Sequence, residues 1–193
     1  MKRIIGLTGG IGTGKTTVSN YLAHRHQLPV LDADIYAREA VQEGSPILSN
    51  IFERYGVSVR LPDGTLNRKR LGEIIFTNPA ERQWLEQQIH PYVRSRFQSQ
   101  VSTLLDPRVV LVVPLLFEAN MTDLVTEIWV VSCSPEQQLR RMMERDRLSL
   151  EESQARLNSQ LPLHEKVTRA DVVLDNSSTP EALLKQVDLA LLY

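Results

Sequence analysis

The sequence contains little cysteine and no long apolar run. Cys133 is the one cysteine among 193 residues, which excludes an internal disulfide framework and a cysteine-based zinc cluster. Because it lies in an apolar run, we interpret it as a core residue rather than a nucleophile. No apolar run reaches the roughly 18 residues that a membrane-spanning helix needs. With 193 residues and 42% hydrophobic content, the chain is long enough for one buried core with appendages and short for two independent domains.

The sequence also lacks an excess of either charge. It has 22 basic and 23 acidic residues, a net charge of -1 and a pI of about 6.4. Without a general basic field, neither nucleic acid nor a membrane is expected as a partner, and any anion site must be local. The start, Met1-Lys2-Arg3, lacks the apolar region and cleavage site of a signal peptide. We expect a cytoplasmic monomer.

The most informative stretch is a glycine-rich loop, Gly9-Gly10-Ile11-Gly12-Thr13-Gly14-Lys15-Thr16, between a strand-like and a helix-like run. Its glycines permit positive φ and a close backbone approach, so successive N–H groups point at a β-phosphate. Lys15 is placed to bridge the β- and γ-phosphates, and the Thr16 hydroxyl to coordinate Mg²⁺. The sequence therefore predicts a nucleoside triphosphate site.

Five short apolar segments alternate with helical stretches. They are residues 4–7, 28–31, 109–113, 128–131 and 172–174. Alternation of this kind predicts an α/β fold with a doubly wound parallel sheet. The segment 109–113 is apolar throughout, as a strand covered on both faces should be, and we expect it at the centre of the sheet.

Local signals place several helices. Capping residues and prolines predict helix starts at Ser45-Pro46, Asn67, Asn78-Pro79, Ser134-Pro135 and Ser149. The first of these helices is expected to end at Gly56, and the third to be interrupted near His90-Pro91.

The chain has two expected appendages. About 75 residues separate the second strand from the third, far more than a crossover needs. We expect a mostly helical insertion there, with a subdomain at 62–88 that closes over a substrate at the carboxyl ends of the strands. The second appendage is expected at 139–170.

Asp32 and Asp34 follow the second strand, at the edge where open parallel sheets bind ligands. If strand alternation continues through them, both carboxylates point the same way. One would then accept a proton from a substrate hydroxyl while the other helps to organise Mg²⁺. The alternative is that they cap a helix over 35–43, because aspartate is favoured at N-caps.

Other charged residues are candidates for the same edge. Glu118 follows the third strand, and its segment forms either a substrate wall or a turn over the core. Arg140 has acidic neighbours one helical turn away on either side and is expected to be solvated. Arg141 and Arg145 carry like charges one helical turn apart, and an anionic ligand would relieve the repulsion between them. The pair therefore suggests a phosphate-sensing lid.

Taken in order, the motifs resemble those of the dephospho-coenzyme A kinase family over nearly the whole chain. The matching motifs are Gly-Leu-Thr-Gly-Gly-Ile-Gly at 6–12, Asp-Ala-Asp at 32–34 with Ala37-Arg38, Asp63-Gly64 with Leu66-Asn67-Arg68, His90-Pro91, Pro-Leu-Leu-Phe-Glu at 114–118, Arg141 with Arg145-Asp146, Gln-Leu-Pro-Leu at 160–163 and Asp-Asn-Ser at 175–177. Many kinases share the phosphate loop, whereas the ordered set is far more specific. Thr13 and Thr16 stand where serine is common in similar sequences.

This resemblance implies ATP-dependent phosphorylation of the ribose 3′-hydroxyl of dephospho-coenzyme A, giving coenzyme A and ADP, with Mg²⁺ as cofactor. It implies a single P-loop kinase domain over 1–193 with a five-stranded core like that of nucleoside monophosphate kinases. Within it, 62–88 would be the acceptor-binding insertion and 139–170 the lid.

The resemblance also assigns roles to single residues. It implies Asp34 as the base, Lys15 and Arg141 as further catalytic residues, and Thr16 as the metal ligand. The implied acceptor-binding residues are Thr8, Asp34, Leu116 and Glu118. The implied ATP-binding residues are Gly10, Ile11, Gly12, Thr13, Gly14, Lys15, Thr16, Thr17, Arg141, Arg145 and Asn176.

Two alternatives share the phosphate loop. Another small-molecule or nucleoside monophosphate kinase would use the same chemistry on a different acceptor. A regulatory GTPase or NTP-driven switch is a different class, but the guanine-reading Asn-Lys-x-Asp motif is absent from the sequence. The large insertion also suits a second substrate better than a switch loop.

Overall fold

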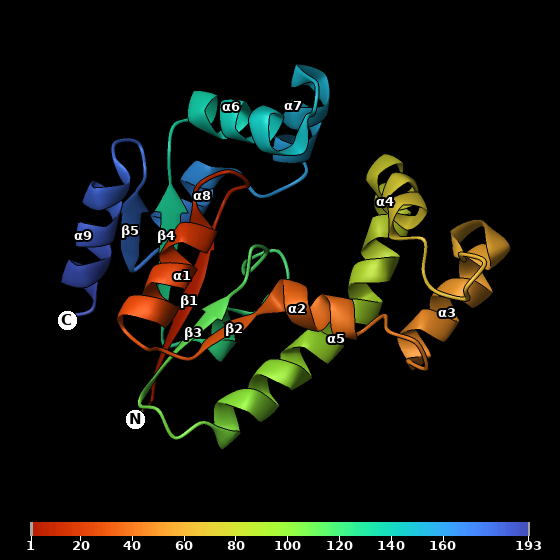
Figure 1. Cartoon of the computed structure of the whole chain (residues 1–193), viewed down its shortest axis with the longest axis horizontal. Helices are drawn as coiled ribbons and strands as arrows, with labels where there is room; N and C mark the ends of the chain where they lie inside the picture. Colours follow the sequence, from red (N-terminus) through yellow and green to blue (C-terminus); the bar gives the residue numbers. More distant parts are fainter. Residues whose placement is uncertain (1, 193) are drawn as a thin grey trace. The chain divides into compact units, whose positions relative to one another are not determined.

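The computed structural model describes residues 2–192 and contains a five-stranded parallel sheet (Figure 1). Its strands are β1 (Arg3–Gly9), β2 (Val30–Asp32), β3 (Arg108–Val112), β4 (Glu127–Ser132) and β5 (Val172–Asp175). All five predicted strand segments are confirmed, and so is the doubly wound α/β class.

The strands lie in the order β2-β3-β1-β4-β5, so β1 is the central strand. The expectation that residues 109–113 form the central strand is wrong. β3 nevertheless pairs on both sides, with β1 and with β2, and Val109 and Val110 are fully buried. An apolar sequence reports burial on both faces, which any interior strand has, and does not report the position of the strand in the sheet.

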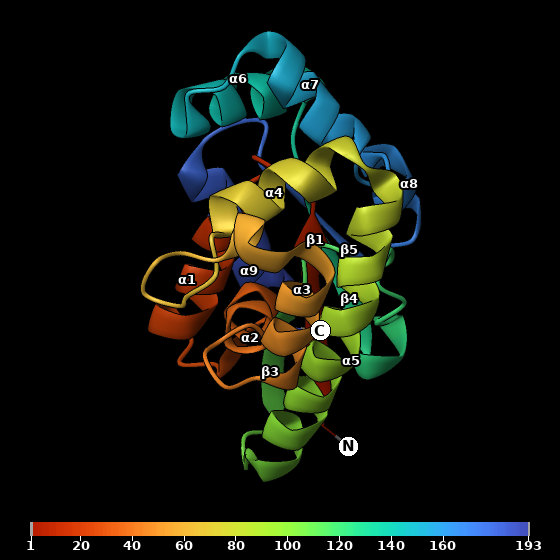
Figure 2. The ribbon, with the colours of Figure 1, turned by 90° about the vertical axis from the view of Figure 1, so that its right-hand side faces the viewer.

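Helices cover both faces of this sheet. α1 (Lys15–Arg25) and α9 (Pro180–Ala190) pack on one face, where Val18 and Val187 join the strands in one apolar core. α8 (Leu163–Thr168) lies on the other face, as the two perpendicular views show (Figures 1 and 2).

A short 3₁₀ turn, η2 (Thr122–Leu124), lies between β3 and β4, and two further helices follow β4. They are α6 (Pro135–Asp146) and α7 (Leu150–Asn158). Each begins with a capping box, at Ser134 and Ser149, so both predicted starts are confirmed.

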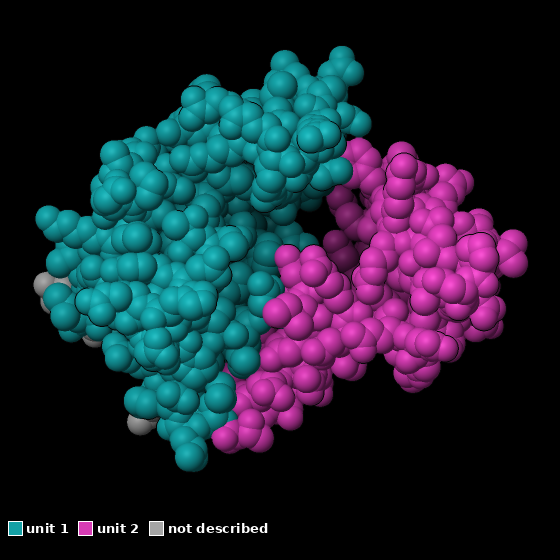
Figure 3. Space-filling view, in the orientation of Figure 1, with its two compact units in different colours: residues 1–32, 104–193 teal, residues 33–103 magenta. Residues whose placement is uncertain are grey.

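The chain divides into two compact units (Figure 3). Unit 2 spans Ala33–Thr103, and unit 1 contains the sheet and the described residues on either side of that span. The predicted insertion at 62–88 lies inside unit 2.

Unit 2 is helical and has its own core. Its elements are α2 (Ala33–Glu39), α3 (Pro46–Tyr55), η1 (Gly56–Val59), α4 (Arg68–Thr77) and α5 (Pro79–Thr103). Its buried apolar cluster comprises Ala40, Val41, Leu48, Ile51, Val59, Leu66, Leu71 and Leu85. The helix boundaries predicted in this region, at Ser45, Gly56, Asn67 and Asn78, are confirmed.

The predicted interruption of α5 is wrong, because the helix runs through Pro91. Proline removes one backbone donor from a helix interior, but here Leu85 before it and Val93 and Phe97 after it are all buried. Packing of both halves holds them in one helix. Of the described helices, none is both long and apolar enough to cross a membrane.

The strand pattern does not continue past Asp32. α2 begins at Ala33, so Asp32 ends a strand whereas Asp34 lies in the first turn of a helix. The expectation that alternation aligns the two carboxylates is therefore wrong. The helix also ends at Glu39, four residues short of the end considered from the sequence.

Candidate functional site

The loop between β1 and α1 has the backbone shape expected of a phosphate-binding loop. Gly12 and Gly14 have φ angles of 75° and 103°, which glycine adopts without steric cost. Lys15 Nζ donates hydrogen bonds to the carbonyl oxygens of Gly9 at 3.0 Å and Gly10 at 2.7 Å. The ammonium group and the N–H groups at the start of α1 thus provide local positive charge for an anion.

Gln138 on α6 holds the first half of this loop. Its Nε2 donates to the carbonyl oxygen of Ile11 at 2.8 Å, and the residue is 5% exposed. A Cβ atom on Gly10 would lie 2.3 Å from that nitrogen, so a larger residue there would force the Gln138 amide to move away from the loop. Sequence reasoning missed Gln138, because a single glutamine in an amphipathic helix belongs to no motif.

Asn176 and Arg141 hold the second half of the loop. Asn176 Nδ2 donates to the carbonyl oxygen of Thr13 at 2.8 Å. Arg141 donates from Nη2 to the carbonyl oxygen of Asn176 at 3.0 Å and from Nη1 to that of Gly12 at 3.3 Å. The structure therefore brings these two predicted residues, which are far apart in the sequence, to the phosphate loop.

The other arginines of α6 also have partners. Arg145 donates two hydrogen bonds to the Asp146 carboxylate, at 2.8 and 2.9 Å, and this lowers the pKa of Asp146. Arg140 lies 4.0 Å from Glu144 and is mostly exposed, as expected. Arg141 and Arg145 do not depend on an anion to relieve their repulsion, because each guanidinium already contacts protein oxygens.

Two predicted acceptor residues, Thr8 and Leu116, are fully buried. Thr8 Oγ1 donates to the carbonyl oxygen of Pro114 at 3.2 Å, just beyond β3. Glu118 ends the same segment, and 24% of its side chain is exposed. Thr8 thus supports the backbone of the segment that presents Glu118.

Lys166 on α8 is a fully buried cation beside Glu118. Its Nζ lies 2.8 Å from Glu118 Oε1 and donates to the carbonyl oxygen of Pro114 at 3.1 Å. The backbone N–H of Leu161 donates to the same Oε1 at 3.0 Å. Glu118 Oε1 therefore connects the segment after β3 with Leu161 and with α8. Glu118 Oε2 has no hydrogen-bond partner among the described residues.

No sequence signal distinguishes Lys166 from a surface lysine, because it stands in a polar stretch that includes His164 and Glu165. Only the packing of α8 against the sheet buries it.

In unit 2, Asp34 is exposed and lines a cavity of about 310 Å³. Arg38 and Arg68 also line this cavity, and Arg68 donates to the carbonyl oxygen of Arg38 at 3.3 Å. The remaining wall is mostly apolar, with Val41, Leu66, Leu71, Ile75, Leu85 and Ile89. A carboxylate and two guanidinium groups on an apolar wall suit a ligand that has both a hydroxyl and an anionic group.

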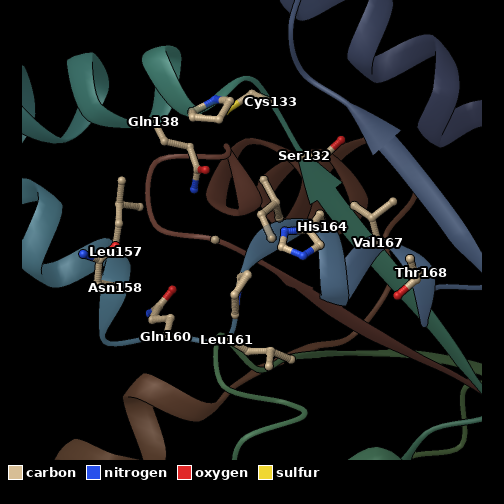
Figure 4. Close-up of a pocket in the computed structure, with 14 residues that line it drawn as sticks. Ser132, Cys133, Gln138, Leu157, Asn158, Gln160, Leu161, His164, Val167 and Thr168 are labelled. Atoms are coloured by element: carbon tan, nitrogen blue, oxygen red, sulfur yellow. The ribbon is translucent and has the colours of Figure 1, made fainter.

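A second cavity, of about 860 Å³, lies in unit 1 beside the phosphate loop (Figure 4). Gly10, Gln138 and Cys133 line it together with residues from the segment 157–168. Cys133 is 7% exposed, which confirms its prediction as a core residue, and burial raises the pKa of its thiol. No sequence motif predicted this cavity.

The chain is similar to known proteins over nearly its whole length. A family model described as dephospho-CoA kinase matches residues 3–181. A dephospho-CoA kinase of Trichormus variabilis is 66% identical, over 98% of this chain and 97% of the relative. One of Synechococcus elongatus is 54% identical, over 99% of this chain and 92% of the relative.

Solved structures are similar as well. The dephospho-CoA kinase of Campylobacter jejuni has a TM-score of 0.71 and 29% identity, covering 100% of this chain and 96% of that chain. The Thermus thermophilus protein TT1252 has a TM-score of 0.83 and 35% identity, over 99% and 97%. A shikimate kinase of Bacteroides thetaiotaomicron, at 16% identity, 97% and 95% coverage and a TM-score of 0.55, shares the fold alone.

Proposed function

Because the chain belongs to the dephospho-CoA kinase family, we propose that its phosphate loop, Arg141 and Asp34 carry out that family's reaction. The reaction is ATP-dependent phosphorylation of the ribose 3′-hydroxyl of dephospho-coenzyme A, giving coenzyme A and ADP in the final step of coenzyme A biosynthesis. The observation that carries the function is the 66% identity to a dephospho-CoA kinase over 98% of the chain.

ATP is held in unit 1 by the residues predicted from the sequence, from Gly10 to Thr17 with Arg141, Arg145 and Asn176. Lys15 moves its ammonium from the loop carbonyls to the β- and γ-phosphates. The contact of Arg141 with Gly12 supports this assignment, because it keeps the guanidinium next to the loop, where negative charge develops during transfer.

P-loop kinases generally use ATP with Mg²⁺, and the residues present fit that ion. Thr16 is exposed in the first turn of α1, and its hydroxyl is an oxygen ligand of the kind Mg²⁺ prefers. When bound, Mg²⁺ neutralises charge on the β- and γ-phosphates.

Asp34 acts as the base. Its exposed position at a cavity wall supports this role, because a base must reach a hydroxyl that arrives with the substrate. As the 3′-oxygen bonds to the γ-phosphorus, its proton passes to Asp34 and the bond from phosphorus to the ADP oxygen breaks.

The acceptor is bound with help from Glu118, whose Oε2 is available for a substrate donor, while Thr8 and Leu116 shape the segment that presents it. The acceptor-binding subdomain at 62–88 and the lid at 139–170 belong to this proposal. The cytoplasmic location and the monomeric state stay predictions.

A coupled assay that follows ADP formation tests the function. The purified chain is given MgATP and, in turn, dephospho-coenzyme A, AMP, CMP and shikimate. We expect a kcat/KM at least about 100-fold higher for dephospho-coenzyme A than for the other acceptors, with a 3′-phosphate on the product. Faster turnover of a nucleoside monophosphate or of shikimate would assign another kinase activity.

A further inference from the structure

The cavity of about 860 Å³ in unit 1 is not accounted for by nucleotide binding. The residues that line it do not include Lys15, Arg141 or Asn176, which mark the nucleotide side of the phosphate loop. It meets the loop at Gly10, on the side covered by Gln138. Its volume lies within the usual range of small-molecule sites, roughly 300 to 1,000 Å³.

The wall of this cavity selects for a neutral ligand. No aspartate, glutamate, lysine or arginine is among the described residues that line it. Apolar contacts come from Pro135, Leu157, Leu161, Pro162, Leu163 and Val167. Amide groups come from Gln138, Asn158 and Gln160, and Gln138 lies across the cavity from Gln160 and Leu161 (Figure 4). An anionic ligand would find only the His164 imidazole as a source of positive charge there, whereas an apolar chain that contains amides would match most of the wall.

Gln160 supplies an independent sign of a ligand. Its Oε1 is buried and has no hydrogen-bond partner among the described residues. A buried acceptor without a partner is unfavourable, so such atoms usually await a donor. The terminal amide of glutamine rotates readily, which lets Oε1 turn toward a donor in the cavity.

We propose that this cavity binds the pantetheine arm of dephospho-coenzyme A, a proposal that rests on the function proposed above. The arm is neutral and combines apolar methyl and methylene groups with two secondary amides and a terminal thiol. Its apolar groups match the leucine, proline and valine contacts, and an amide N–H meets Gln160 Oε1.

The position of the wall supports a role in acceptor binding. Leu161 lines the cavity, and its backbone N–H donates to Glu118 Oε1 at 3.0 Å. Lys166 holds the same carboxylate oxygen from the buried side at 2.8 Å. The wall and the predicted acceptor residue Glu118 are therefore fixed to each other, so one substrate can use both.

The proposal is tested with the variant Gln160→Leu, which removes the unpartnered acceptor Gln160 Oε1. We expect the KM for dephospho-coenzyme A to rise about threefold to tenfold, the effect of one hydrogen bond, with the KM for ATP unchanged. Pantetheine alone should inhibit competitively against dephospho-coenzyme A, and its inhibition constant should rise by the same factor. The melting temperature of the free protein should not fall, because the substitution removes an unsatisfied buried polar atom.

Ser153→Ala is the matched control, because Ser153 Oγ is also buried without a partner but does not line the cavity. It should leave both constants unchanged. Val167→Phe, which fills part of the cavity, should raise the KM for dephospho-coenzyme A further. An unchanged KM in both cavity variants, or no competition by pantetheine, would overturn the proposal. A wild-type chain without turnover of dephospho-coenzyme A would instead overturn the function itself.

Discussion

The two units hold their candidate reactive groups in different ways. In unit 1 the phosphate loop is fixed before any ligand binds, by hydrogen bonds from Gln138, Arg141 and Asn176 to loop carbonyls. In unit 2 Asp34 is exposed in the first turn of a short helix. One region is preorganised, and the other presents its group at the surface.

The difference follows from what each group has to do. Binding of phosphates depends on several N–H donors in fixed positions, and their dipoles stabilise charge most when they need not reorganise. A base acts only on a hydroxyl that the second substrate brings. Substitutions of the side chains that hold the phosphate loop should therefore affect binding and stability together, whereas a change at Asp34 should affect the chemical step.

The largest expected effect is on turnover in Asp34→Asn. We expect kcat to fall by roughly 10²- to 10⁴-fold, the usual contribution of a general base, with the fold unchanged. Steady-state kinetics on this variant and on Asp32→Asn make the comparison, and the Asp32 change should be less damaging. A larger loss in Asp32→Asn would place the base at the end of β2 in unit 1.

The next effect is on stability in unit 1, around the Lys166–Glu118 ion pair. Glu118→Ala leaves a fully buried ammonium group without its counter-ion and should cost roughly 3–5 kcal/mol of unfolding free energy. Lys166→Met leaves a carboxylate that is partly exposed and can be hydrated, so it should cost about 1–2 kcal/mol. Urea denaturation of both variants measures the difference. Equal costs would show that the lysine is hydrated in solution.

Arg141→Ala should lower turnover by at least about tenfold. Because Arg141 also donates to the carbonyl oxygens of Gly12 and Asn176, the substitution should destabilise the nucleotide-free protein by about 1 kcal/mol. Arg140→Ala is the control and should be nearly silent, since its contact with Glu144 is exposed. Steady-state kinetics and thermal melts on both variants make the comparison. A larger loss of turnover in Arg140→Ala than in Arg141→Ala would contradict the role of Arg141 at the phosphate loop.

The smallest effect is a pH dependence within unit 2. Hydrogen bonds from Arg54 and then Tyr55 lower the pKa of Glu81 from 4.5 to about 2. A lowered folded-state pKa stabilises the protein above about pH 4.5, and this contribution is lost as the pH falls toward 2. Between pH 5 and pH 2 the melting temperature of Glu81→Gln should therefore fall less than that of the wild type. The difference should be at most about 3 °C, because water screens this partly exposed pair. An identical pH profile in thermal melts would refute this contribution.

Local patterns predicted the parts of the molecule that depend on neighbouring residues. The phosphate loop, the capping boxes at Ser134 and Ser149, and the five strands all follow from spacing and composition. The expected break at Pro91 failed because burial on both sides of the proline outweighs one lost hydrogen bond. The position of β3 failed because apolar composition reports burial and not strand order.

The side chains that sequence reasoning missed depend on contacts between distant segments. Lys166 is buried by packing against the Pro114 carbonyl and Glu118, some 50 residues away, and Gln138 by contact with the phosphate loop. Neither residue type is unusual at its position, so no local pattern distinguishes it. Asn176 was assigned from the family resemblance, and Arg141 was assigned from its charge pattern as well; the structure adds the hydrogen bond that joins them.

The affinity for MgATP tests the contrast between the two units most directly. Isothermal titration calorimetry on the wild type, Asp34→Asn and Lys15→Ala gives the three dissociation constants. We expect Asp34→Asn to bind MgATP within about threefold of the wild type, and Lys15→Ala to bind at least about tenfold more weakly because it loses a charge-assisted contact. A loss of affinity in Asp34→Asn as large as that in Lys15→Ala would show that the two units do not divide nucleotide binding and proton transfer between them.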